Sequence, residues 1–211
     1  MRDLSTVPSS DVAFTPSVKA IQERRGSRGE FTDQEARGGW ATSITPSLAE
    51  FIAKIRTCYL ATATASGQPY VQHRGGPPGF LRVLDSQTLG FADFPGNRHY
   101  LSTGNLAENP RAFLFLIDYT SRRRVKLWGS ARTVENDPEL NRRLVVDSYP
   151  AEAEQAIVFT LEAWDMNCAR HIPIMVPSDD VLAMRQQLKS RIDELERENA
   201  ALKVSLGGPA V

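Results

Sequence analysis

The fold of this chain is decided by a stretch that runs from Cys58 to Pro110, which reads CYLATATASGQPYVQHRGGPPGFLRVLDSQTLGFADFPGNRHYLSTGNLAENP. Two extended runs, residues 59–65 and 68–73, flank a Ser-Gly pair, and this arrangement is typical of a β-hairpin. A stiff Arg-Gly-Gly-Pro-Pro-Gly loop follows at 74–79. The first half of the stretch therefore predicts antiparallel β structure that ends in a basic, glycine-rich loop.

The second half of the stretch predicts another hairpin and then a short helix. Its strands are expected at 80–84 and 88–92, and the helix is expected to start at 96–98 and to stop near Pro110. A strand, a basic glycine-rich loop and a helix N-terminus that carries Arg98 together indicate a site for a phosphorylated ligand.

The composition limits the class of protein. With 211 residues, 41% of them hydrophobic, we expect one domain with appendages or at most two small domains. Lys and Arg together number 25, as do Asp and Glu, so no overall field attracts nucleic acid or a membrane. No apolar run approaches the roughly 20 residues of a membrane span, and the N-terminus lacks the pattern of a signal peptide. Two cysteines, Cys58 and Cys168, make no disulfide framework. We expect a soluble cytoplasmic protein.

Extended runs outnumber helical ones between the N-terminal and C-terminal segments. Strands are predicted at 59–65, 68–73, 80–84, 88–92, 111–118, 121–135 and 155–165. The apolar run 111–118 is typical of a strand buried on both faces, and Gly129 indicates a bulge or bend. Helices are predicted at 15–26, from Pro46, at 98–109 and at 138–148. Seven strands with only short helices between them favour a barrel over a βαβ sheet.

The N-terminal segment is expected to be an arm. Residues 1–13 are polar and are expected to be disordered. Residues 27–39 are rich in glycine and charge and are expected to be irregular. Phe31 and Trp40 nevertheless indicate that the arm packs on a barrel, either its own or that of a partner subunit.

The C-terminal segment carries a seven-residue repeat. Val181, Leu188, Leu195 and Leu202 recur at that interval, and Ile192 and Asn199 occupy the other seam position of a coiled coil. Asn at the seam favours a parallel dimer, whereas Arg185 weakens the first heptad. The alternative is a single amphipathic helix packed on its own barrel. Three parts are thus predicted: an arm with a short helix (1–44), a barrel domain (45–176) and a coiled-coil-like helix (177–205).

Four motifs in register carry a resemblance to a known family. They are GQPYVQHRGGPPGF, TLGFADFPGNR, GNLAENPRAFLFL and RRRVKLWGSARTV, and the later segment WDMNCARHIP resembles one branch of it. Over about residues 45–165 the chain resembles the pyridoxamine 5′-phosphate oxidase-like FMN-binding proteins. The resemblance implies a mainly β split barrel with flanking helices, a homodimer, FMN in clefts between two subunits, and an oxidoreductase that acts on a small substrate or electron donor.

Two arginines fit the phosphate of FMN. Guanidinium groups give paired charge-assisted hydrogen bonds, so Arg74 and Arg98 are candidates for the clamp, and Ser102 and Asn105 are expected to add neutral donors from the same helix. Arg74 and Arg98 as plain surface residues are the alternative. With the family resemblance included, the predicted cofactor-binding residues are Gln72, His73, Arg74, Gly75, Phe91, Ala92, Asn97, Arg98, Ser102, Asn105, Arg124 and Lys126. Arg124 and Lys126 are implied to act from the neighbouring subunit.

The resemblance also implies a wall on the substrate side of the flavin. Its predicted members are Trp164, Asn167, Cys168 and His171. The alternative is that Trp164 is a plug and Cys168 a small core residue. Trp128 is expected in the core.

Other functions are weighed against the flavin reading. Cys168 and His171 are too few ligands for zinc, so no metal is expected. The Arg-x-His pair of the true oxidases is not reproduced, because Arg170 and His171 are adjacent, and no catalytic residue is assigned. A non-catalytic flavin- or heme-binding barrel is the alternative function, with His73 or His171 as the axial ligand of a heme. A DNA-binding zipper is rejected because acidic residues, not basic ones, precede the heptads.

Overall fold

A computed structural model describes residues 7–147, 149, 151–167 and 169–206. The described chain forms two compact units. One contains the residues up to Asp118 together with Arg122–Ile172, and the other contains Tyr119–Ser121 and the residues from Pro173 onward. Among the described residues, none of the helices has the length and apolar composition that a membrane crossing needs.

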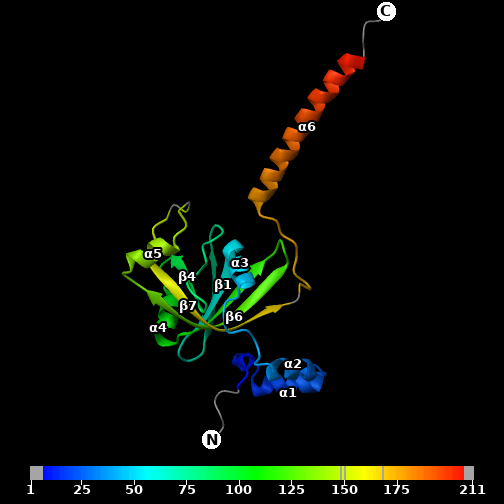
Figure 1. The fold of residues 1–211 in the computed structure, drawn as a ribbon. Helices are drawn as coiled ribbons and strands as arrows, with labels where there is room; N and C mark the ends of the chain where they lie inside the picture. The colour runs from blue at the N-terminus through cyan, green and yellow to red at the C-terminus, as the bar shows by residue number, and fades with distance from the viewer. Residues whose placement is uncertain (1–6, 148, 150, 168, 207–211) are drawn as a thin grey trace, which may run out of the picture. The chain divides into compact units, whose positions relative to one another are not determined.

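The first unit is built on a sheet of seven strands in which every pair is antiparallel (Figure 1). The strands are β1 Thr57–Ala63, β2 Pro69–Gly75, β3 Arg82–Val83, β4 Thr88–Asp93, β5 Arg111–Asp118, β6 Arg123–Val134 and β7 Gln155–Asn167. Their order across the sheet is β2-β1-β5-β6-β7-β4-β3. The predicted mainly β split-barrel class with flanking helices is confirmed, although β3 is shorter than expected.

The core lies on the inner face of the curved sheet. Leu60, Leu114, Leu127 and Phe159 come from four different strands and have no exposed surface. Helix α3, Pro46–Lys54, adds Leu48 and Ile52 to this core from the segment before β1. Burial of each such side chain contributes about 1.5–3 kcal/mol, so the inward residues of alternate positions stabilise the barrel.

A bulge in β6 bends the barrel. The register between β6 and β7 shifts at Trp128 and Gly129. A Cβ atom at Gly129 would lie 2.0 Å from the carbonyl oxygen of Thr160, so only glycine allows the two backbones to come this close. The bulge predicted at Gly129 is confirmed.

Strand β5 corrects the expectation of burial on both faces. Leu114 and Leu116 point inward and are fully buried, whereas Phe113 and Phe115 are half-buried on the opposite side. On that side Phe115 pairs with Tyr59, and Ala61 pairs with Val71, which is 58% exposed. We call Tyr59, Val71, Phe113 and Phe115 the outer face. Because a single chain leaves this face partly uncovered, β5 alternates instead of being buried throughout.

From Ser9 onward the N-terminal segment is largely helical, contrary to the prediction of a disordered start over residues 1–13 and an irregular arm, whereas residues 1–6 lie outside the described part of the chain. A 3₁₀ helix, η2, spans Ser9–Val12, α1 spans Pro16–Arg25 and α2 spans Arg28–Ala36. The first helix was correctly predicted, since Gly26 ends it in the left-handed conformation at φ 78°.

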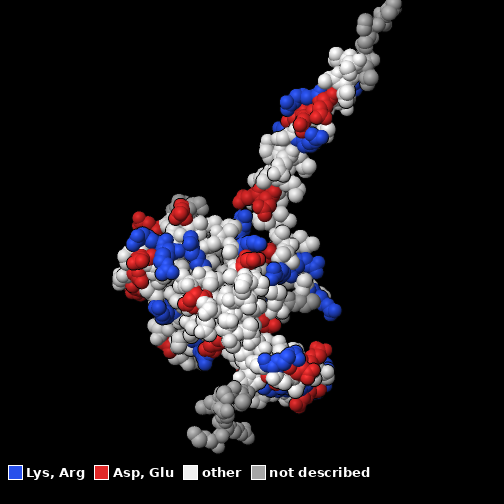
Figure 2. Space-filling view, in the orientation of Figure 1, with Lys and Arg blue, Asp and Glu red and all other residues white. Residues whose placement is uncertain are grey.

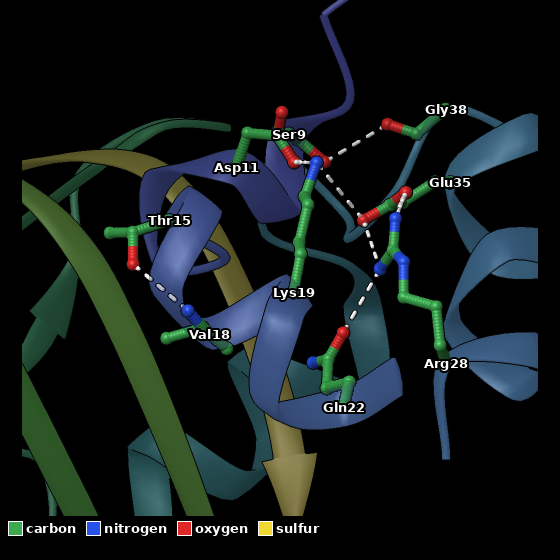
Figure 3. Close-up of polar contacts among 9 residues, drawn as sticks. All are labelled: Ser9, Asp11, Thr15, Val18, Lys19, Gln22, Arg28, Glu35 and Gly38. Carbon is green, nitrogen blue, oxygen red and sulfur yellow. Dashed lines mark hydrogen bonds and ion pairs between the residues drawn. The ribbon is translucent and has the colours of Figure 1, made fainter. Parts of the chain in front are cut away.

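Side-chain pairs hold these short helices together (Figure 3). Lys19 of α1 lies 2.6 Å from a carboxylate oxygen of Asp11 and 3.4 Å from one of Glu35. Arg28 forms a two-pronged ion pair with Glu35 and donates to the Gln22 side chain at 3.0 Å. The glycine- and charge-rich composition that predicted an irregular arm thus supplies the partners that stabilise α2.

Aromatic stacking attaches this arm to the barrel, as expected from Phe31 and Trp40. Trp40 is 8% exposed and stacks on Trp128 with ring centroids 4.5 Å apart. Phe14 packs edge-on against Trp40, and Phe31 packs against Phe14. Trp128 is half-buried between the arm and the barrel and is not an interior core residue.

Three further helices complete the chain: α4 Leu101–Glu108, α5 Pro138–Leu144 and α6 Ser178–Leu206. Helix α5 ends four residues earlier than predicted. Helix α6 belongs to the second unit, and every one of its described side chains is exposed. Basic and acidic side chains lie interspersed both on α6 and on the visible face of the barrel (Figure 2).

Candidate functional site

The candidate site lies at a seam where the barrel is not closed by strand pairing. Strand β2 is one edge of the sheet, and β3 at the other edge pairs only with Leu89 and Gly90 of β4. Residues 91–93 of β4 therefore have no strand neighbour on that side among the described residues. An ion pair between Arg74 of β2 and Asp93 of β4 spans this seam.

The Arg74–Asp93 pair belongs to a polar network. Asp93, only 8% exposed, accepts a second hydrogen bond, at 2.9 Å, from the side chain of Gln155, which also donates to Thr103. Arg74 donates to the Gln72 amide oxygen at 3.0 Å, and Ser102 donates to the same oxygen at 2.8 Å. The network therefore joins β2, β4, β7 and α4 around one buried charge pair.

Arg74 keeps one donor for a ligand. Its guanidinium carbon lies 5.8 Å from the centre of the Phe91 ring. Its Nε atom is buried and has no hydrogen-bond partner among the described residues. A buried donor without an acceptor costs about 1–3 kcal/mol, so an acceptor that reached Nε would stabilise the site.

Two pockets meet at this arginine, and Arg74, Asp93 and Phe94 line both of them. The apolar pocket has a volume of about 160 Å³, and its other lining residues are His73, Gly75, Gly76, Pro77, Phe80, Phe91, Ala92, Leu144, Val146 and Tyr149. The polar pocket has a volume of about 300 Å³, and its other lining residues are Tyr70, Gln72, Gly96, Asn97, Arg98, His99, Tyr100, Leu101, Ser102, Thr103 and Glu154.

The polar pocket has several features of an anion site, and its two acidic residues, Asp93 and Glu154, are engaged by Arg74 and by the Tyr100 hydroxyl. Arg98 and Tyr100 both adopt left-handed backbone conformations, with φ of 57° and 51°. Such conformations are uncommon outside glycine and cluster at ligand sites, where successive N–H groups form concavities for anions. Helix α4 then begins at Leu101 without a side-chain cap, so its first N–H groups and its dipole favour a negative ligand.

The helix start corrects one prediction about the clamp. The sequence placed Arg98 on the same helix as Ser102 and Asn105, whereas the left-handed residues delay the helix until Leu101. Arg98 lies in the preceding turn, where it lines the polar pocket. The side chain of Tyr100 donates to Glu154 at 2.8 Å, and this hydrogen bond raises the pKa of the Tyr100 phenol.

Nine of the predicted cofactor-binding residues line these pockets. Gln72, Arg74, Asn97, Arg98 and Ser102 line the polar pocket, and His73, Gly75, Phe91 and Ala92, together with Arg74, line the apolar one.

Asn105 lies elsewhere. Its amide donates to the Thr62 hydroxyl at 3.0 Å in a buried position, which ties α4 to β1.

Arg124 and Lys126 also lie away from both pockets. They alternate with inward residues on β6, and Lys126 pairs with Phe115 of the outer face. Lys126 forms an ion pair with Asp165 at 2.9 Å and lies 5.6 Å from the Trp40 ring. The Nε atom of Arg124 is buried and has no partner among the described residues. Their predicted role in a neighbouring subunit's site stays a prediction.

Trp164 and His171, the described members of the predicted substrate-side wall, line neither pocket. The Trp164 indole donates to the carbonyl oxygen of Ser43 at 2.9 Å, so it fastens the arm to β7. His171 is exposed in the loop after β7 with φ 62°. Asn167 ends β7, but its side chain lies outside the described part of the chain, as does Cys168.

The described residues contain no group of three or more His, Cys, Asp or Glu side chains arranged to hold a metal ion. Cys58, on the inner face of β1, is buried, and this burial raises the pKa of its thiol to about 12. Cys58 is therefore an inert core residue, not a nucleophile.

The sequence reading missed several pocket residues. Asp93 is the most important, and the alternation of β4 gives a signal for it, because Phe91 and Asp93 must share a face and a buried acid needs a cation. Tyr149 and Val146 come from the loop after α5, and no sequence pattern connects that loop to Arg74.

Comparison with known proteins identifies the family. The model of the pyridoxamine 5′-phosphate oxidase family matches residues 44–188. The chain belongs to this family. The match covers the whole barrel, begins after the N-terminal helices and ends within α6. A search of curated proteins found no match.

Solved structures similar to this family member include HupZ from Group A Streptococcus, at 14% identity over 58% of this chain and 93% of that one, with a TM-score of 0.48. A protein from Clostridium acetobutylicum related to general stress protein 26, of the pyridoxinephosphate oxidase family, has 16% identity over 58% and 85%, with a TM-score of 0.42. The heme storage protein HutZ from Vibrio cholerae has 20% identity over 57% and 89%, with a TM-score of 0.38.

Proposed function

We propose that this protein binds FMN at the seam and acts as an oxidoreductase on a small substrate or electron donor. The observation that carries the proposal is the junction of the two pockets at Arg74. A polar pocket with a second arginine and an uncapped helix N-terminus adjoins an apolar pocket lined by aromatic rings.

The residues present fit the two ends of FMN. The phosphate carries close to two negative charges, which Arg98 and the first N–H groups of α4 would neutralise and hold. The flat isoalloxazine needs an apolar surface and a few donors, which Phe91, Phe94 and the unpartnered Nε of Arg74 would supply. Bound FMN would supply the redox chemistry, while these residues would hold and orient it.

A second subunit would complete the site. The apolar pocket, at about 160 Å³, is smaller than the roughly 300–1,000 Å³ of a typical ligand pocket. The outer face is partly uncovered and carries the Arg124 and Lys126 side of β6. Our proposal is that two chains pair through this face and that each supplies these basic residues to the flavin of the other.

Heme is the second candidate ligand, because His73 lines the apolar pocket. Its Nε2 atom, however, forms a 2.6 Å hydrogen bond with the Thr57 hydroxyl, so one of the two ring nitrogens that could coordinate iron is already engaged. His171 is exposed and lines neither pocket. The geometry therefore favours FMN.

An absorbance spectrum of the purified protein, taken after it is loaded with excess FMN and desalted, tests the ligand. Flavin bands are expected to remain. A Soret band after loading with heme, lost in His73→Ala or His171→Ala, with no retention of flavin, would overturn the proposal in favour of heme.

Arg98→Ala tests the phosphate site. We expect FMN affinity to fall about 10- to 100-fold, the effect of losing a charge-assisted hydrogen bond. Affinity for riboflavin, which lacks the phosphate, should not change. Both can be measured by quenching of flavin fluorescence. Arg111→Ala is the matched control, because Arg111 forms an exposed ion pair with Glu162 and lines neither seam pocket. Equal weakening for both flavins would show that Arg98 does not contact phosphate.

A further inference from the structure

Helix α6 carries a stripe of exposed apolar side chains along one side. Val181, Leu188, Ile192, Leu195 and Leu202 are between 45 and 59% exposed. At about 1.5 Å per residue, the 29 residues of α6 extend roughly 43 Å. A helix in water takes most of its stability from packing of its apolar face. The exposed stripe of α6 therefore indicates a partner.

We propose that α6 pairs with α6 of a second copy of this chain as a parallel, in-register coiled coil. In this pairing Val181, Leu188, Leu195 and Leu202 occupy one seam position, and Ile192 and Asn199 occupy the other. We infer a second copy of this chain as the partner because the charged residues beside the stripe attract their counterparts on an identical helix.

The flanking charges provide the first argument for self-pairing. In a parallel pair, the residue just before Ile192 or Asn199 faces the residue five positions later in the partner chain. Arg191 then faces Glu196 of the partner subunit, and Glu198 faces Lys203 of the partner subunit. Symmetry repeats both pairs, so four attractive contacts flank the seam. Within one chain Arg191 forms an ion pair with Glu194, and this exposed contact contributes little stability.

Asn199 provides the argument for parallel orientation. In a parallel, in-register pair, Asn199 meets Asn199 of the partner subunit, and the two amides can hydrogen-bond to each other. In the antiparallel pair centred on Ile192 and Leu195, Asn199 would instead face Leu188 of the partner subunit and leave a buried amide without a partner. An unpaired amide costs about 1–3 kcal/mol, which favours the parallel arrangement. Arg185 at the seam weakens the first heptad in either orientation, and its long stem can carry the charge out to water.

Disulfide cross-linking of the full-length protein tests this pairing without reference to FMN. Leu188→Cys and Leu195→Cys place a thiol at the seam, and Ser190→Cys places it on the opposite side of the same helix turn. Seam cysteines of a parallel pair come within the roughly 4.4–6.8 Å between Cα atoms that a disulfide requires, whereas residue 190 does not. The unmodified protein reports any cross-link through Cys58 or Cys168.

We expect both seam variants to cross-link at least about tenfold faster than Ser190→Cys, as seen on non-reducing gels. Similar cross-linking rates at the three positions would overturn the proposal. This holds even if the barrels dimerise, because the test reports only on the contact between the helices. A mixture of Arg185→Cys and Leu202→Cys chains tests orientation and keeps Asn199 in place: a parallel pair gives only like-with-like cross-links. Joining of residue 185 to residue 202 would show an antiparallel pair and overturn the parallel one. Because none of these readouts depends on flavin, they separate this proposal from the proposed function.

Discussion

Asp93 lies at the seam with both carboxylate oxygens engaged, one by Arg74 and the other by Gln155. A charge buried to this degree is stable only when it is paired and hydrogen-bonded. The residue therefore has two roles at once. It closes the barrel where backbone pairing is missing, and it sets the position of Arg74 between the two pockets.

Asp93→Asn removes the charge that balances Arg74. Because an unpaired buried guanidinium remains, we expect the free energy of unfolding to fall by about 3–5 kcal/mol, measured by urea denaturation. Glu162→Gln, which breaks the exposed pair with Arg111, is the control and should cost no more than about 1 kcal/mol. Equal effects of the two substitutions would show that the seam pair is not buried in solution.

Cys58 gives a prediction about reactivity. Burial raises the pKa of its thiol to about 12, so at pH 8 only roughly one thiol in ten thousand is ionised. In the folded protein we expect iodoacetamide to leave Cys58 unmodified, and in guanidinium chloride we expect full alkylation, both followed by peptide mass mapping. Rapid labelling of the folded protein would mean that β1 opens locally.

At the scale of elements, the N-terminal helices show how short segments acquire stability from tertiary contacts. Helices α1 and α2 are ten and nine residues long, too short to persist alone in water. The polar cluster of Asp11, Lys19, Arg28 and Glu35 joins them, and the Trp40–Trp128 stack fixes them to β6. The two contacts support one another, because Phe31 of α2 packs on Phe14, and Phe14 packs on Trp40. Loss of the polar cluster is therefore expected to weaken the attachment as well.

The pH dependence of this attachment follows from Glu35. A hydrogen bond from Arg28, followed by the nearby charge of Lys19, holds the pKa of Glu35 below its ordinary value of 4.5. A carboxyl group whose pKa is lowered by folding stabilises the folded state at any pH above its ordinary pKa. This stabilisation is lost as the pH falls through the pKa of the folded state. We therefore expect the arm to detach below about pH 4.5, seen as a change in the fluorescence of the Trp40–Trp128 stack.

Glu35→Gln is the informative variant for that titration. It should weaken attachment at neutral pH and remove the Glu35 contribution to the acid transition, so its curve approaches that of the unmodified protein only at low pH. Glu162→Gln again serves as the control and should leave the transition in place. An unchanged curve for Glu35→Gln would show that other carboxyl groups govern the attachment.

At the scale of the whole molecule, the outer face limits what one chain can do alone. Val71 is 58% exposed near the centre of β2, on the same face of the sheet as Tyr59 and Phe115. The same strand directs Gln72 and Arg74 to the opposite side, into the polar pocket. His73, on the same face as Val71, lines the apolar pocket, so the proposed subunit contact adjoins the proposed flavin site along this strand.

Val71→Lys tests the link between these two faces. A charge at the centre of an apolar contact is costly to bury, so we expect the barrel contact to break and flavin affinity to fall at least about tenfold. Val83→Lys, on the short edge strand β3, is the control. Analytical ultracentrifugation should be done in a protein shortened before α6, so that helix pairing does not mask the change. Unchanged mass and affinity in Val71→Lys would exclude this face.

The sequence alone determined the strands and several helix starts. Alternating apolar residues, the Gly129 bulge, and the helix starts at Thr15-Pro16 and at Pro46 are local signals, and the structure has these features. The Arg-Gly-Gly-Pro loop and the Gly-Asn-Arg turn directed attention to Arg74 and Arg98, and both residues line the polar pocket. The left-handed residues before α4 escaped detection, since nothing in Arg98 or Tyr100 favours that conformation over a helical one.

Only the tertiary structure decided which distant residues meet. The Arg74–Asp93 pair joins strands that share no backbone hydrogen bonds, so no periodicity connects them. Trp128 was expected in the core, but Trp40 of the N-terminal arm stacks on it. The Trp164 indole donates a hydrogen bond to the carbonyl oxygen of Ser43, a contact that the sequence did not predict. The physical reason is that local propensity acts over a few residues, whereas the position of a buried charge or an aromatic ring depends on whichever remote segment can neutralise or cover it.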